Sequence, residues 1–144
     1  MARHELCIAP DAAALAGLID QVQACCRAAG LAEDDVLRMT LAIEEAAANV
    51  IAHAFAGLPP PHRIALSLEV SPRHCVAELT DNGQEFDPTD KAAPDLSLPL
   101  EARDPGGLGI HLMRRMVDRL DYRRSGGDNV LRLEITAGRR GRGR

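Results

Sequence analysis

The chain has 144 residues, of which 46% are hydrophobic and 26% are charged. These proportions are typical of one soluble globular domain. No apolar run approaches the roughly 20 residues that span a bilayer. The N-terminal MARHELCIAP also lacks the apolar core of a signal peptide. We therefore expect a cytoplasmic protein that does not interact with a membrane.

Charge and composition exclude several classes of function. The net charge is -4 although residues 139–144 carry four arginines, so the body of the chain is acidic and does not favour direct nucleic-acid binding. We expect a single domain over residues 1–137 and a basic, disordered tail over 138–144. Lys91 is the one lysine and lies outside any GxxxxGK[ST] sequence, which excludes a Walker A loop. The four cysteines form no CxxC pair, so we expect small buried hydrophobes rather than a zinc site or disulfides.

The first half of the chain predicts one strand and two helices. Glu5 to Ala9 is a short strand pattern that ends at Pro10. Asp11 is a suitable N-cap for an amphipathic helix that Gly30 ends. A second helix is predicted from the acidic Glu33–Asp35 to about Ala56.

The second half predicts four strands, one helix and one long loop. Arg63–Val70 and Cys75–Thr80 alternate as strands of a hairpin, and periodicity then vanishes over residues 81–105. A helix is predicted over Ile110–Arg119, followed by strands at Asp121–Arg124 and Asn129–Thr136. The order β-α-α-β-β-loop-α-β-β predicts an α/β (α+β) fold. We expect a two-layer sandwich with helices on one face of a largely antiparallel sheet.

The helix around residues 41–55 carries a polar stripe. The sequence LAIEEAAANVIAHAF is apolar on nearly every side, which predicts a helix without an ordinary solvent face. Glu45, Asn49 and His53 recur every four residues and so share one face. An amide such as Asn49 can hold Mg²⁺ when phosphates supply the other ligands, and Glu45 is placed to act as a general base. Periodicity alone fits this functional interpretation and a buried polar network equally well. Glu44 points away, and His53 is interpreted as a satisfied histidine at the helix end.

Two further stretches carry chemistry. Asp81-Asn82-Gly83 stands where a strand stops; it fits a turn, and it also fits a carboxylate that reads an adenine amino group. Gly106-Gly107-Leu108-Gly109 opens a helix, which fits an anion site or a hinge, although glycine turns are common.

The order of these three stretches resembles a known family. EEAAANVIAH, DNGQEFDP and GGLGIHLMRRMVD, separated by a long loop, match the three-box layout of the GHKL (Bergerat-fold) ATPase superfamily. Among its branches the chain most resembles the bacterial anti-sigma-factor serine/threonine kinases. The resemblance covers nearly the whole chain.

The resemblance implies a role for each box. Glu45 corresponds to the catalytic base, and Asn49 to the Mg²⁺ ligand. Asp81 corresponds to the residue that reads adenine, with Gly83 beside the base. Residues from about Asp90 to Pro105 correspond to the ATP lid. The residues that flank the phosphates are Gly106, Gly107, Leu108 and Gly109.

The chain departs from the family at two places. Glu85 stands where many relatives have a small residue or proline. Relatives often place a threonine beside the adenine, and Asn129 and Thr136 are both candidates for that position.

The resemblance also implies a function. It suggests a homodimeric anti-sigma factor that sequesters a sigma factor. With ATP and Mg²⁺ it would phosphorylate a small STAS-type anti-sigma-factor antagonist on serine or threonine. The alternative is a non-catalytic ATP-binding regulatory module, against which the presence of Glu45 argues. The catalytic half of a sensor histidine kinase is disfavoured because no phospho-accepting helix precedes the ATP domain.

Overall fold

The computed structural model describes residues 1–90 and 107–137. Gly106, most of the predicted lid and the predicted tail lie outside these residues. The elements, in chain order, are β1 (Ala2–Ile8), α1 (Ala12–Ala28), α2 (Glu33–Asn49), the π-helical turn η1 (Val50–Ala54), β2 (Ile64–Ser71), β3 (His74–Asp81), the 3₁₀ turn η2 (Pro88–Asp90), α3 (Gly107–Met116), β4 (Arg119–Ser125) and β5 (Asp128–Thr136). None of the helices among the described residues is both long and apolar enough to cross a membrane.

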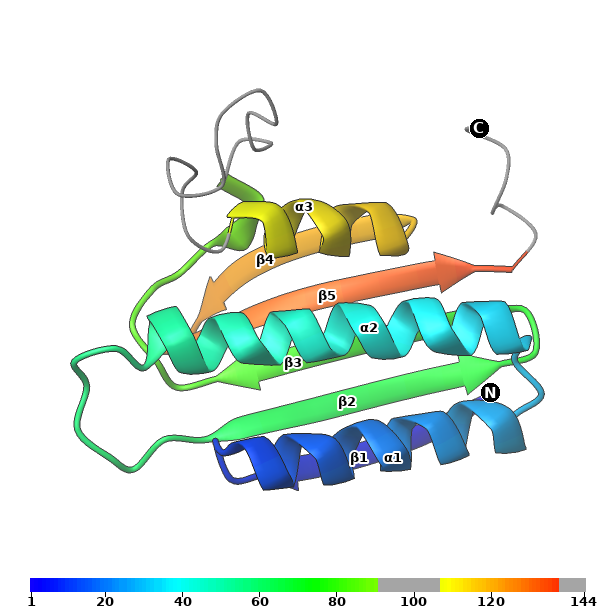
Figure 1. Ribbon diagram of the computed structural model, residues 1–144, viewed down its shortest axis with the longest axis horizontal. Helices are drawn as coiled ribbons and strands as arrows, with labels where there is room; N and C mark the ends of the chain where they lie inside the picture. Colours follow the sequence, from blue (N-terminus) through cyan, green and yellow to red (C-terminus); the bar gives the residue numbers. More distant parts are fainter. Residues whose placement is uncertain (91–106, 138–144) are drawn as a thin grey trace.

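The fold has two layers, as predicted. The five strands form one sheet in the order β1-β2-β3-β5-β4, and every neighbouring pair is antiparallel. The three α-helices lie side by side on one face of this sheet (Figure 1). Side chains of β2 and β3 alternate between buried and half-buried, because successive residues point to the helices and to the open face in turn.

The core lies between the helices and the sheet. Each α-helix supplies an apolar stripe at helical spacing, and the strands supply every second residue. Asp11 caps α1 as predicted, because its side chain accepts a hydrogen bond from the N–H of Ala14 at 2.8 Å. The fully buried large side chains come from all the layers, among them Leu18, Met39, Leu68, Met113 and Leu133.

Several predicted boundaries differ from the structure. The first strand begins at Ala2, ahead of the predicted Glu5, because its edge residues pair with β2 although they lack an apolar pattern. The helix predicted over 110–119 begins three residues earlier, and Arg119 already belongs to β4. The long helix ends at Asn49, after which one turn continues as a π-helix.

Two predictions about burial are wrong. The helix over residues 41–55 does have a solvent face, made by Leu41, Glu44, Ala48 and Ala52, because α1 and α3 flank α2 without covering it. The cysteines are not uniformly buried. Cys26 and Cys75 lie in the core, Cys25 is partly buried, and Cys7 is exposed because it points to the open face of the sheet.

The topology gathers the three boxes at one end of the sandwich. The end of α2, the end of β3 and the start of β5 meet there, together with the start of α3 (Figure 1). The register sets Asp81, the last residue of β3, directly opposite Asn129 near the start of β5. The candidate site is therefore built at strand and helix ends, on a rigid sheet.

Candidate functional site

Asn49 occupies a buried position at the end of α2. The residue is only 6% exposed, and it lines a pocket together with Asp81 of β3 and Met113 of α3. Its Nδ2 is buried without a hydrogen-bond partner among the described residues. An unpaired buried amide is costly, so this atom fits a site where a polar ligand supplies the partner.

Glu45 lies one turn before Asn49 and opens onto a neighbouring groove. The groove is lined by Leu41 and Glu44 of α2, and by Leu112, Met113 and Met116 of α3. Within the described part of the chain, no hydrogen bond or ion pair engages the Glu45 carboxylate. A half-buried carboxylate with this accessibility is suited to accept a proton from a bound hydroxyl group.

Gly109 leaves the space that the Glu45 carboxylate occupies. A Cβ at position 109 would lie 2.9 Å from Cδ of Glu45, closer still to one carboxylate oxygen. A side chain at position 109 would therefore displace the Glu45 carboxylate from the place it holds beside the first turn of α3. Of the glycine box, Gly107 and Leu108 also belong to the first turn of α3, and the N-terminal turn of a helix is a suitable place for an anion.

Asp81 is the buried carboxylate of the site, at 4% exposure. Its Oδ1 accepts hydrogen bonds from the N–H of Gly83 at 2.9 Å and from Nδ2 of Asn129 at 2.8 Å. Burial raises the pKa of the Asp81 carboxyl above its usual value. The two hydrogen bonds and the nearby Arg124 guanidinium act in the opposite direction.

The Asp81-Asn82-Gly83 stretch does not form a hairpin. After it the chain packs against the end of α2, where the N–H of Gln84 donates to the carbonyl of Ala54 at 2.9 Å. A Cβ on Gly83 would lie 2.6 Å from that carbonyl oxygen. Glycine at position 83 is therefore needed for the close approach of β3 to η1.

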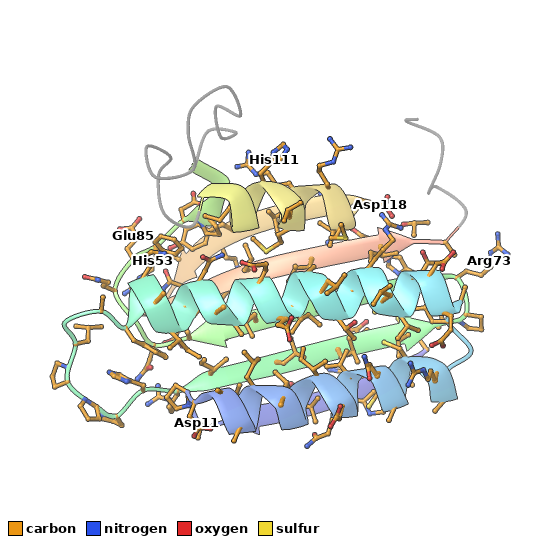
Figure 2. The ribbon with its side chains drawn as sticks, in the orientation of Figure 1. Asp11, His53, Arg73, Glu85, His111 and Asp118 are labelled. Atoms are coloured by element: carbon orange, nitrogen blue, oxygen red, sulfur yellow. The ribbon has the colours of Figure 1, made fainter. Side chains whose placement is uncertain are left out.

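The structure distinguishes the two candidates for the position beside the adenine. Asn129 touches Asp81, whereas Thr136 lies at the other end of β5, where its N–H donates to Asp118. Asp118 and Glu85 stand at opposite ends of the molecule in Figure 2, with Glu85 at the end that holds the boxes.

His53 and Glu85 lie near each other at this end, as Figure 2 shows. The ring of His53 stacks on Phe86, with centroids 5.1 Å apart and planes inclined by 20°. The histidine thus has an aromatic partner at the end of the helix. Glu85 is exposed and does not line the pocket.

Three residues of the site were not identified from the sequence. Phe86 and Tyr122 line the pocket, and Arg124 donates hydrogen bonds to its edge. Pairing the two last strands about Gly126-Gly127 sets Arg124 opposite Asn129, so the hairpin register was the available signal. The space enclosed by the pocket is only ≈ 20 Å³, about one water molecule.

Comparison with known proteins identifies the family. The model of the histidine kinase-like ATPase domain matches residues 8–135. The chain is 38% identical over 95 residues to the serine/threonine-protein kinase BtrW of Bordetella bronchiseptica, covering 66% of each chain. It is 31% identical over 106 residues to the serine-protein kinase RsbW of Bacillus cereus, covering 71% of this chain and 65% of the relative. The matches thus span slightly less than two thirds of the relatives' length.

Two solved structures share the fold. One holds the RsbU and RsbW domains of a Mycobacterium tuberculosis protein. It matches with a TM-score of 0.66 and 14% identity, over 94% of this chain and 32% of that one. The other is the histidine kinase domain of a blue-light activated kinase of Erythrobacter litoralis. Its TM-score is 0.57 at 15% identity, over 88% of this chain and 61% of that one. The three boxes lie at one end of the sheet, and the family model spans nearly the whole chain. The chain therefore belongs to the histidine kinase-like ATPase domain family.

Proposed function

We propose that the protein is an ATP- and Mg²⁺-dependent serine/threonine kinase that acts as an anti-sigma factor. In this proposal it sequesters a sigma factor and phosphorylates a small STAS-type antagonist. The observation that carries the proposal is that Glu45, Asn49 and Asp81 lie at the same end of the sandwich, where Gly83 lets β3 approach η1 and Gly109 leaves room for the Glu45 carboxylate. The names of the curated relatives, both protein kinases, support it.

The nucleotide would lie between β3, β5 and α3. Oδ1 of Asp81 is already engaged by two donors, which leaves Oδ2 to accept from the amino group of adenine. The phosphates would meet the N-terminal turn of α3. The Asn49 amide is the described group that would hold the magnesium ion, with phosphate oxygens as the other ligands. Bound there, Mg²⁺ would neutralise charge on the transferred phosphoryl group.

Glu45 would act on the acceptor. Its carboxylate faces the groove beside the phosphate-binding end of α3, where a serine or threonine hydroxyl can reach it. Glu45 orients this hydroxyl and takes its proton as the oxygen bonds to the γ-phosphorus and the bond to ADP breaks. The binding of both reactants against a rigid sheet supplies the positioning.

Substitution of Glu45 tests the proposal. Glu45→Gln should lower phosphate transfer to a cognate antagonist by about a hundredfold or more, while ADP affinity stays near that of the wild type. Asp20→Asn is the control, because it removes a carboxylate from an exposed position of α1 outside the groove. Transfer by Glu45→Gln at the wild-type rate would exclude this residue as the base.

The partners need a separate experiment. A pull-down from cytoplasmic extract, with ATP and then with ADP, should recover a sigma factor and a small antagonist. Light scattering at several concentrations tests the proposed homodimer. ATP turnover with and without the antagonist separates the kinase from an ATP-binding module that does not catalyse transfer. Recovery of neither protein would contradict the anti-sigma role and leave the nucleotide site untouched.

A further inference from the structure

The Asn129 side chain is the most heavily engaged polar group in the described part of the site. Its Nδ2 donates to Oδ1 of Asp81 and to the carbonyl of Gln84, both at 2.8 Å. Its Oδ1 accepts from the Tyr122 hydroxyl at 2.6 Å, from Nη1 of Arg124 at 3.0 Å and from the N–H of Phe86 at 3.2 Å. Two acceptors on one side and three donors on the other fix the amide orientation. The amide has no donor left for a base.

The engagement of Asn129 ties the edge strand β4 to the buried carboxylate. Tyr122 and Arg124 both belong to β4 and both point to the helix side of the sheet. Arg124 also donates to the carbonyl of Gly83 at 2.9 Å. An asparagine can connect these groups by hydrogen bonds because its planar amide carries both donors and an acceptor. A threonine hydroxyl offers a single donor.

The hydrogen bonds from Asn129 and Gly83 determine which oxygen atom Asp81 offers to a ligand. With Oδ1 held by Gly83 and Asn129, the ionised carboxylate presents Oδ2 as an acceptor. Burial and the carboxylate of Asp128 favour the protonated form, whereas Asn129, Gly83 and Arg124 favour the ionised form. An ionised carboxylate accepts from an amino group and repels a carbonyl oxygen. A protonated one can donate to that oxygen.

We propose that Tyr122 and Arg124 are positioning residues that act through Asn129 on Asp81, and that they set the preference of the site for 6-amino over 6-oxo purine nucleotides. This inference rests on the proposed function, because it assumes that the base lies beside Asp81. It assigns to Asn129 the orientation of the carboxylate rather than contact with the base.

The pair Arg123 and Arg124 provides a matched experiment. Arg123 points to the open face, where it pairs with Glu78, so either substitution removes one positive charge from β4. Calorimetry would give the dissociation constants of ADP and of IDP, which differ at position 6 of the purine. The wild type should bind ADP more tightly. Arg124→Met should lower this preference at least about tenfold, the scale of one lost charge-assisted hydrogen bond. Arg123→Met should leave it unchanged.

Further variants separate positioning from a general structural effect. Tyr122→Phe removes only the hydroxyl and should reduce the preference less than Arg124→Met, and Arg124→Lys should restore part of it. As the pH is lowered, the preference should fall at a higher pH in Arg124→Met than in the wild type, because Asp81 loses a charge that favours its ionisation.

The outcomes distinguish this inference from the proposed function. Equal preference in Arg123→Met and Arg124→Met, or a pH profile unchanged by Arg124→Met, would overturn the positioning role. A wild type that binds neither nucleotide, or binds IDP as tightly as ADP, would contradict the placement of adenine beside Asp81. That result would also overturn the present inference, which assumes this placement. A failure confined to the two arginine variants would leave the kinase proposal intact.

Discussion

At the scale of single residues, the site depends on the absence of a side chain as much as on the groups present. Glu45 and Gly109 come from different helices, and the carboxylate occupies the space where a Cβ of residue 109 would lie. The place of the proposed base thus depends on a glycine that takes no part in proton transfer.

Gly109→Ala tests this packing. The added methyl group would displace the Glu45 carboxylate, and a displacement of about 1 Å can cost about a hundredfold in rate. We expect kcat for phosphate transfer to fall by about tenfold to a hundredfold with little change in the unfolding temperature. Gly17→Ala is the control, because nothing lies within 4 Å of a Cβ at that helical position. Wild-type kcat in Gly109→Ala would contradict the role assigned to this contact.

Asp81 illustrates a conflict between stability and function. Folding raises its pKa by burial, so the fold favours the protonated form. The contribution of the group to stability is complete below the unfolded pKa of about 4 and is lost as the pH rises through the folded pKa. Asp81→Asn keeps an oxygen for the N–H of Gly83 and cannot ionise. We expect it to be more stable than the wild type at neutral pH and to bind ADP at least about tenfold more weakly.

Urea denaturation at several pH values would measure the first effect. The stability difference between Asp81→Asn and the wild type should shrink toward acid pH, where the native carboxyl is protonated. Asp11→Asn, at the exposed N-cap of α1, controls for the loss of a carboxylate elsewhere. A difference that is largest at acid pH would contradict the direction of the pKa shift.

At the scale of elements, the end of α2 is completed by the segment that follows β3. Gln84 supplies donors to carbonyl groups of the π-helical turn η1 and of the residues that follow it. Its Nε2 donates to the carbonyls of His53 at 3.0 Å and Ala56 at 3.2 Å, and its N–H donates to Ala54. The aspartate box is therefore held against the helix that carries Asn49.

Gln84→Ala would remove the two side-chain hydrogen bonds and leave the backbone bond in place. We expect a loss of about 1–2 kcal/mol in the free energy of unfolding and faster hydrogen exchange at the amides of η1. Gln21→Ala, at an exposed position of α1, should show neither effect. If exchange in η1 were unaltered by Gln84→Ala, the cap would not be what stabilises this turn.

The elements were largely predictable because their periodicity is local. Apolar residues at helical spacing located α1 and α2, and alternation located β2, β3 and β5. The π-helical turn was not predicted, and its contacts with Gln84 join residues about thirty positions apart, which local periodicity does not reveal. The choice between Asn129 and Thr136 required the strand register, since each follows the same strand pattern and only pairing places one of them opposite Asp81.

At the scale of the whole molecule, largely buried charged side chains connect the layers at the end of the sandwich opposite the boxes. Arg38 of α2 pairs with Asp35 on its own helix at 3.2 Å and with Asp118, between α3 and β4, at 3.7 Å. Asp118 in turn accepts from the N–H of Thr136 at the end of β5. The helical layer and the sheet are thus joined by charge at one end and by the candidate site at the other.

Arg38→Met tests how much this link contributes. The side chains of Arg38 and Asp35 are 15% and 5% exposed, so removing the guanidinium leaves a buried carboxylate with less compensation, at a cost of about 3 kcal/mol. Arg27→Met breaks the pair between Arg27 and Glu33, whose side chains are 53% and 66% exposed, and should change the stability little because water screens that pair. Urea denaturation of the two variants measures the difference. Since the link lies far from the boxes, ADP affinity should be retained in folded Arg38→Met. A loss of affinity at full folding would show that this end of α2 also positions Asn49.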